Sequence, residues 1–258
     1  MFAIAELTLR KMKEPAFFIM LAIALVLAFM TSGFDSLSDQ MKSDSIFAGI
    51  INSGRGEEKL LTSTFFIFGI SAILAGFLGA AEIPRDISSG LILLIMSKPV
   101  KKYEYMLGKY FGILGVCMIF FTFSEAVVVV SSYLCRGNLY SFPCILRQFE
   151  LAAAFIPYTA IVVAISCFAG ELASIILTAM YLLISLSFNL VPILAAMLPA
   201  GFAGQMEKGI FMIYYLFPNY IYYFQDHRIL GVVFIFLMVY SFAIAAIFLC
   251  IAALKLEI

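Results

Sequence analysis

Six long apolar stretches restrict this chain to folds that lie in a lipid bilayer. A hydrocarbon core of about 30 Å needs about 20 mostly apolar residues in a helix. The stretches of this length and character are residues 15–32, 60–81, 110–134, 151–170, 172–198 and 229–254. We therefore predict an all-α, polytopic membrane protein in which residues 1–258 form a single transmembrane domain of six spanning helices.

The composition agrees with a bilayer as the main solvent. Hydrophobic residues make up 64% of the chain and charged residues 12%, against about 45–50% and about 25% in soluble domains. The formal net charge is zero, so no overall field attracts nucleic acid.

The motifs of common active sites and metal sites do not occur in the sequence. It has one histidine, His227, and five scattered cysteines, with no CxxC, HExxH or Cys/His cluster. It has no GxxxxGK[ST] phosphate loop and no GxSxG nucleophile motif. We predict neither an enzyme nor a resident cofactor or metal, and the chain does not hydrolyse ATP through a phosphate loop of its own.

The basic residues set the predicted orientation, because lysine and arginine are enriched in short cytoplasmic loops. With a cytoplasmic N-terminus, nine fall inside: Arg10, Lys11, Lys13, Arg85, Lys98, Lys101, Lys102, Lys109 and Lys255. Seven fall outside: Lys42, Arg55, Lys59, Arg136, Arg147, Lys208 and Arg228. The inner charges also crowd close to helix ends, so we predict that both termini are cytoplasmic.

Two segments outside the spans have a helical pattern of their own. Residues 1–13 place Phe2, Ala5, Leu9 and Met12 on one helical face, which predicts an amphipathic helix in the inner interface. A simple extension of the first span is the alternative. Residues 199–228 are aromatic but interrupted by glycines and Pro218, which predicts a broken helix pair at the outer side.

The inner segment 82–109, between the second and third spans, is long for a simple connection and has a helical sequence pattern of its own. Pro84 can open a helix, because its missing N–H is not needed in the first turn, and Pro99 ends it. An apolar stripe runs along it through Ile87, Leu91, Leu94 and Ile95. We predict a short helix that lies roughly parallel to the membrane on the cytoplasmic face.

The order of motifs in this segment resembles the signature loop of type-2 ATP-binding-cassette (ABC) permeases. The matching residues are Glu82-x-x-Arg85-Asp86-x-x-x-Gly90-Leu91, Met96-Ser97-Lys98-Pro99-Val100 and Tyr103-x-Tyr105-x-x-Gly108-Lys109. The small six-helix subunits similar to the permease of nitrous-oxide reductase maturation systems show this pattern, and also a Pro-Asn element like Phe217-Pro218-Asn219. The chain departs from the family in having Lys98 and Lys101 where arginine is frequent.

The resemblance implies a permease subunit of an ATP-driven transporter in the cell (inner) membrane, acting as an exporter. Such permeases pair with a second copy, and each docks a separate cytoplasmic ATPase subunit that binds the ATP. The helix between spans two and three is then the first coupling helix, and the turn 168–171 takes the place of the second. The implied ATPase-coupling residues are Glu82, Arg85, Asp86, Gly90, Lys98, Pro99, Gly170 and Glu171, with Glu82 and Arg85 forming a pair within the loop.

Glu125 is an acid within the third predicted span. A carboxylate at that depth is costly and usually faces a cavity or a partner. It can line a translocation path or gate. Alternatively, it makes a structural hydrogen bond to a neighbouring Ser or Tyr, or it is a protonated carboxyl. An ion-gradient-driven secondary transporter is the alternative function, and a membrane-embedded enzyme is a further one.

Two other patterns have a structural and a functional interpretation. Ala72, Gly76 and Ala80 recur every four residues, which permits close helix packing within one protomer or between two. Cys135 and Cys144 bracket one outer loop, where they form a disulfide or remain free thiols.

Overall fold

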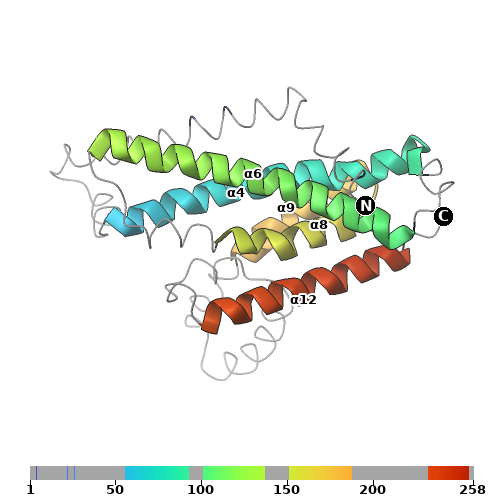
Figure 1. Cartoon of the computed structure of the whole chain (residues 1–258). Helices are drawn as coiled ribbons and strands as arrows, with labels where there is room; N and C mark the ends of the chain where they lie inside the picture. The colour runs from blue at the N-terminus through green and yellow to red at the C-terminus, as the bar shows by residue number, and fades with distance from the viewer. Residues whose placement is uncertain are drawn as a thin grey trace, which may run out of the picture. The chain divides into compact units, whose positions relative to one another are not determined.

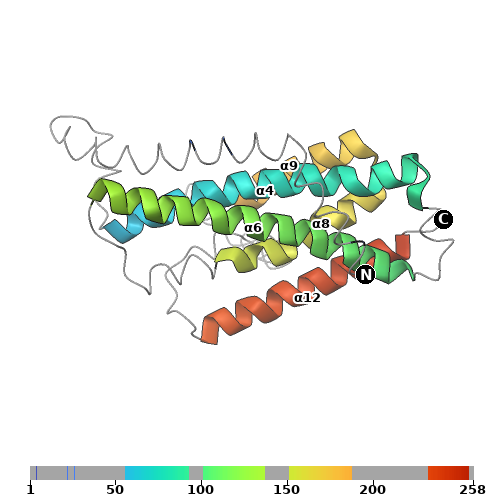
Figure 2. The same ribbon diagram turned by 45° about the horizontal axis from the view of Figure 1, so that its top comes forward.

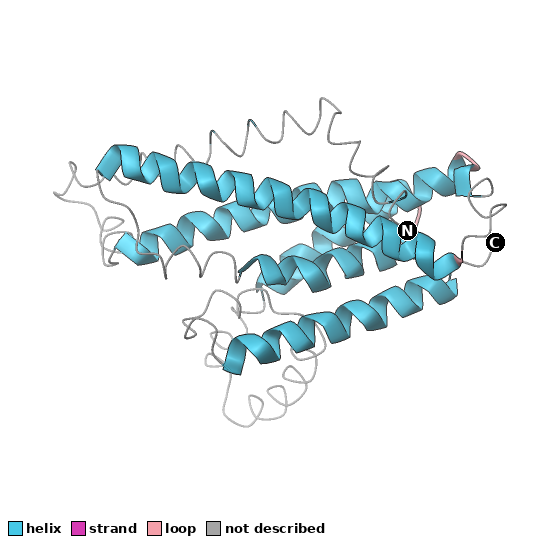
Figure 3. Cartoon of the chain, in the orientation of Figure 1, coloured by secondary structure: helices cyan, strands magenta, loops and turns pink. Residues whose placement is uncertain are grey.

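The computed structural model describes residues 4, 22, 26, 56–92, 101–136, 151–187 and 232–255. These residues form five α-helices and one turn of 3₁₀ helix, and no strand occurs among them (Figures 1 and 3). The helices are α4 (Gly56–Ser88), α6 (Lys102–Arg136), α8 (Phe155–Phe168), α9 (Glu171–Ser187) and α12 (Val232–Lys255), and the 3₁₀ turn η2 (Ala152–Ala154) precedes α8. The all-helical class is as predicted.

Three stretches of helix are long and apolar enough to cross a membrane: Ile67–Ser88, Lys102–Ser131 and Phe234–Lys255. They fall on the second, third and sixth predicted spans. Ala152–Phe168 and Glu171–Ser185 are shorter apolar helices at the positions of the fourth and fifth. The first predicted span lies outside the described residues except for Ala22 and Val26, which are helical.

Helices α4 and α6 are longer than a bilayer crossing requires. At 1.5 Å per residue their 33 and 35 residues extend for about 50 Å each, whereas the hydrocarbon core is about 30 Å thick. The second predicted span ended at residue 81 and the third began at residue 110, so both predictions were too short. Much of the predicted loop 82–109 is therefore the end of α4 and the start of α6.

The prediction that Pro84 opens a new helix is wrong. Helix α4 continues through Pro84 to Ser88. A proline inside a helix removes only one backbone hydrogen bond, and membrane helices tolerate it where neighbouring groups compensate. The chain leaves the helix at Gly90, where φ is +70°, and a second helical stretch includes Leu91 and Ile92. Residues 93–100, and so the rest of the predicted coupling helix, lie outside the described part.

The chain divides into two compact units. Unit 1 comprises residues 1–75 and 107–155, and unit 2 comprises residues 76–106 and 156–258. In unit 1, α4 and α6 lie side by side in both views (Figures 1 and 2), and a hydrogen bond from Thr64 to Glu125 joins them. The core of unit 1 contains the rings of Phe68, Phe121 and Phe155.

Unit 2 contains the end of α4, the start of α6, and helices α8, α9 and α12. Helices α4, α8 and α9 pack closely at Gly76 of α4. A Cβ atom built there would lie 3.0 Å from Thr178 of α9 and 3.0 Å from the Tyr158 hydroxyl of α8. At Gly76, the small-residue pattern therefore allows close packing of helices within one protomer, which was one of its two interpretations.

Four predicted features fall outside the described residues. They are the amphipathic segment 1–13 apart from the helical Ile4, the outer segment 199–228, His227 and Cys144. The disulfide between Cys135 and Cys144 stays a prediction.

Candidate functional site

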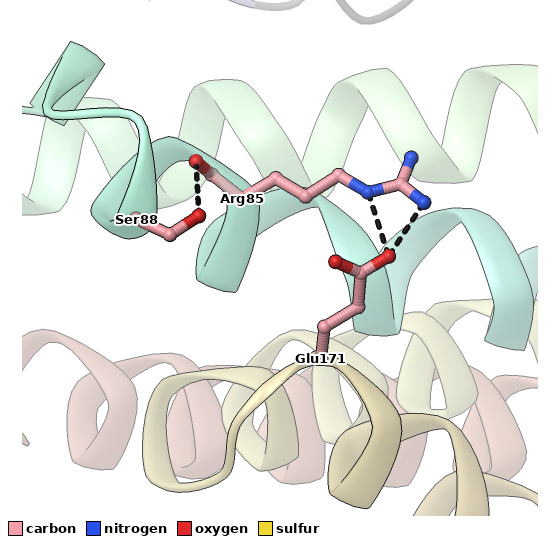
Figure 4. Close-up of polar contacts among 3 residues, drawn as sticks. All are labelled: Arg85, Ser88 and Glu171. Atoms are coloured by element: carbon pink, nitrogen blue, oxygen red, sulfur yellow. Dashed lines mark hydrogen bonds and ion pairs between the residues drawn. The ribbon is translucent and has the colours of Figure 1, made fainter.

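An ion pair between Arg85 and Glu171 is the centre of the candidate site in unit 2 (Figure 4). The Arg85 Nε donates a hydrogen bond of 2.7 Å to Glu171 Oε1, and a second guanidinium nitrogen lies 2.5 Å from the same oxygen. Both side chains remain accessible, with 57% and 42% of their surface exposed. The pair joins segments that are 86 residues apart in the sequence.

The two helix ends favour the charges of this pair. Arg85 lies in the last turn of α4 and Glu171 in the first turn of α9. A helix has partial negative charge at its C-terminal end and partial positive charge at its N-terminal end. Each side chain therefore has the sign that its own helix end stabilises, as well as the opposite sign to its partner.

The end of α4 is closed by local hydrogen bonds. The Ser89 N–H donates to the Arg85 carbonyl at 2.9 Å, and the Gly90 N–H donates to the Ile87 carbonyl at 3.1 Å. The Ser88 hydroxyl donates to the Arg85 carbonyl at 3.1 Å (Figure 4). Glycine readily takes the left-handed conformation that ends a helix in this way. These bonds fix where the chain turns away from α4, directly beside Arg85.

A buried hydrogen bond holds the same helix end to α6. The Tyr105 hydroxyl donates to Asp86 Oδ2 at 2.7 Å, and both side chains are buried. Successive residues of a helix point about 100° apart, so Asp86 binds α6 while Arg85 reaches α9. The end of α4 is thereby attached to two other helices through neighbouring residues.

The turn between α8 and α9 supplies the other half of the site. The Ala169 N–H donates to the Ile165 carbonyl, which prolongs α8, and the Ser174 N–H donates to the Gly170 carbonyl, which starts α9. The Ser174 hydroxyl also donates to the Ala169 carbonyl at 3.0 Å. The turn is short and internally bonded, and it presents Glu171 toward Arg85.

The end of α12 lies close to this turn. The Lys255 ammonium is 6.0 Å from the centre of the Phe168 ring, within the range of a cation–π interaction. Lys101 makes a similar contact with the exposed ring of Tyr103, at 5.7 Å. Unit 2 thus contains two lysine–aromatic contacts, at the start of α6 and between the ends of α12 and α8.

The predicted coupling residues come together only in part. Arg85, Asp86, Gly90, Gly170 and Glu171 all belong to the helix ends described above. Glu82 is buried one turn before Asp86. Arg85 forms an ion pair with Glu171, and the pair between Glu82 and Arg85 stays a prediction. Lys98 and Pro99 lie outside the described residues.

Sequence reasoning missed two features of this site. Tyr105 was part of the quoted motif, but nothing in the sequence indicated that it would bind Asp86. The sequence analysis put Glu171 in the turn 168–171 but predicted no ion-pair partner for it. The one sequence feature that indicates this pair is a basic residue near the C-terminal end of one helix and an acidic residue near the N-terminal end of another. Without the structure, this feature does not show that the two helix ends meet.

Glu125 occupies a separate position in unit 1. Its Oε2 accepts a hydrogen bond from the Thr64 hydroxyl at 3.3 Å. Its Oε1 and the neighbouring Ser124 hydroxyl are buried and have no hydrogen-bond partner among the described residues. The hydrogen-bond partner found for Glu125 is thus Thr64 of α4, where a Ser or Tyr was expected.

The described ranges contain no group of three or more His, Cys, Asp or Glu side chains that could hold a metal ion. The site in unit 2 consists of an exposed ion pair between two hydrogen-bonded helix ends. No model of a known protein family matches the sequence, and a comparison with curated proteins also finds no match.

Proposed function

We propose that this chain is the permease subunit of an ATP-driven ABC transporter, acting as an exporter. In this proposal two copies form the translocation path in the cell membrane, with both termini cytoplasmic. Each copy docks a separate ATPase subunit, which binds the ATP. The Arg85–Glu171 ion pair is the observation that carries the proposal.

The pair supports this function because of the two segments that it joins. Arg85 belongs to the segment between the second and third predicted spans, and Glu171 to the turn between the fourth and fifth. These are the two places where the resemblance puts contacts with the ATPase. An ATPase that moves one segment would move the other with it, because the ion pair connects them. The Asp86–Tyr105 hydrogen bond joins the two ends of the first segment.

Such a connection is what an energy-coupled transporter needs. A ligand or partner shifts a conformational equilibrium only by the difference between its affinities for the two states. A docking surface that spans the ends of α4, α6 and α9 lets the ATPase distinguish two arrangements of these helices. Movement at the surface is then converted into movement of apolar helices.

An ion-gradient-driven secondary transporter is the second candidate function. It is favoured by Glu125, which is buried within the apolar stretch Lys102–Ser131. Ionisable groups at that depth often belong to ion or proton pathways. A membrane-embedded enzyme has less support, since Glu125 has only a hydroxyl partner among the described residues.

Affinity purification of the tagged chain in mild detergent tests the proposal. The preparation is examined for a co-purifying ATPase that contains a phosphate loop. We expect the parent chain to retain it and the single variants R85E and E171R to lose it. Exposed ion pairs contribute about 0–1 kcal/mol to stability, so both variants should fold.

The double variant R85E/E171R is the matched control, since it has the same net charge as the parent chain. If the pair acts by holding the two segments together, the swapped pair restores co-purification. Purification without any ATPase from the native host, under all detergent conditions, would contradict the permease proposal. The ion-gradient alternative would then be the function to pursue.

A further inference from the structure

Glu125 is the only charged residue in a long apolar part of the sequence. Residues 110–135 contain no other Asp, Glu, Lys or Arg, and residues 60–81 and 151–170 contain none. Residues 60–75 and 110–135 are the parts of these ranges that belong to α4 and α6 in unit 1. An acid in such surroundings needs a physical explanation, because charged groups in the bilayer interior are costly and tend to be functional.

The carboxyl group of Glu125 is only partly satisfied. The side chain is 4% exposed, and the Thr64 hydroxyl donates to Oε2 at 3.3 Å. This bond is long, because O–H···O hydrogen bonds are usually about 2.7–2.8 Å. In the part of the chain that the structure describes, Oε1 has no hydrogen-bond partner. One weak hydrogen bond from a neutral hydroxyl does not compensate a full negative charge.

Aromatic rings close off one side of the carboxyl. Phe68 follows Thr64 by one helical turn, and Phe121 precedes Glu125 by one turn, so each pair shares a helix face. The Phe155 ring lies 4.9 Å from the Phe68 ring and 5.3 Å from the Phe121 ring, centre to centre. A layer of three buried rings thus lies about 5.4 Å along the helices from the acid and excludes water there.

No basic residue lies close to Glu125 along its own helix. Lys109 is sixteen residues earlier on α6, about 24 Å along the axis, and Arg136 is eleven residues later, about 16 Å. Cys117 and Tyr133 are the nearest titratable residues on α6, eight residues earlier and eight residues later, each about 12 Å away along the axis. On α4 the nearest charged residues to Thr64 are Glu57, Glu58 and Lys59 at the start of the helix, and α8 contains none.

We propose that Glu125 is a proton-binding site within the membrane part of unit 1. A proton taken up by one carboxylate oxygen gives a neutral carboxyl group, which removes the charge without requiring extra space. A metal cation would require several further oxygen ligands around it, whereas Thr64 supplies a single hydroxyl. The reverse step returns the proton to water when the helices rearrange.

The proton site is independent of the ATPase partnership. Uptake and release at Glu125 would make the conformational equilibrium of unit 1 sensitive to pH, whatever drives transport. In an ATP-driven permease the site would act as a gate. In an ion-driven transporter it would be the site that couples proton movement to transport. The proton site is therefore compatible with both proposed functions, and only its role differs between them.

Labelling with dicyclohexylcarbodiimide tests the proposal directly. This apolar reagent reacts with protonated carboxyl groups in apolar surroundings. The whole chain is treated in native membranes at a series of pH values, and the labelled peptide is identified by mass spectrometry. We expect labelling of Glu125 at pH 6, at least tenfold slower labelling at pH 9, and no label at this position in E125Q.

E82Q is the matched control, because Glu82 is a second buried carboxyl but belongs to unit 2. This variant should keep the labelling of Glu125 unchanged. Should E125Q fail to fold, the mass of the labelled peptide from the parent chain still identifies the reacting residue.

Three results would overturn the proposal. They are the absence of label at Glu125 while other carboxyls react, labelling that does not change with pH, and labelling that Na⁺ suppresses at constant pH. The last result would assign the site to a metal cation. None of these readouts depends on an ATPase, so the failure of the proton site and the failure of the proposed function are distinguishable.

Discussion

Gly76 offers a sensitive test of the helix packing in unit 2. A Cβ atom at this position would lie 3.0 Å from Thr178 Cγ2 and 3.0 Å from the Tyr158 hydroxyl. Both neighbours are buried, and they belong to two different helices. We predict that G76A destabilises the chain, although alanine forms helices better than glycine.

The magnitude follows from two opposing contributions. Replacing glycine with alanine inside a helix gains about 0.8–1 kcal/mol from intrinsic helix propensity. Adding a methyl group to a well-packed contact costs about 1–3 kcal/mol. The branched side chain of Thr178 has little rotational freedom within a helix, so it cannot easily yield. We expect a net loss of up to about 2 kcal/mol.

Gly69, on the same helix, is the matched control. A Cβ atom there would have no neighbour within 4 Å, so G69A should be neutral or gain up to about 1 kcal/mol. Unfolding of the purified variants in detergent, by heat or by increasing dodecyl sulfate, measures the difference. We expect G69A to exceed G76A in stability by about 1–3 kcal/mol.

A second substitution identifies the atom responsible. T178S removes the Cγ2 methyl group that a Cβ atom at position 76 would meet, and it keeps the hydroxyl. The double variant G76A/T178S should therefore recover part of the stability lost in G76A. The reasoning is refuted if G76A is as stable as G69A, or if T178S lowers the stability of G76A as much as it lowers that of the parent chain.

Two further predictions concern the end of α4. Y105F should destabilise the chain by about 1.5–3 kcal/mol, because the buried Asp86 carboxyl loses a hydrogen bond. The control is Y103F, since the Tyr103 side chain is exposed. Equal unfolding midpoints for Y105F and Y103F would contradict this prediction. G90A should cost about 1–2 kcal/mol, because φ is +70° and a Cβ atom is strained there although nothing lies within 4 Å. G90N should cost less, since asparagine adopts this conformation more readily, and an order of stability with G90A above G90N would count against the argument.

The positions of the helices followed largely from local sequence patterns. Apolar runs of helical length predicted the places of α4, α6, α8, α9 and α12. This works because a helix in a membrane needs a continuous run of apolar side chains and satisfies its backbone hydrogen bonds within itself. The start of α8 and the end of α12 lie within a few residues of their predicted positions.

Helix ends were less predictable. Polar residues at the ends of α4 and α6 indicated a loop, yet Asp86 and Tyr105 lie within helices and bind each other there. Pro84 is a typical first residue of a helix, yet it lies inside α4. Whether a helix continues through a proline depends on groups from other segments, which a local pattern does not contain.

The partners of the polar side chains were decided by the tertiary structure alone. From the sequence, a family resemblance suggested Arg85 as a candidate coupling residue, and residue type and position marked Glu125 as an acid in an apolar span. The sequence did not determine that Arg85 would bind Glu171 or that Thr64 would bind Glu125. Those pairs depend on which faces of distant helices meet, and that is fixed by how all the helices pack together.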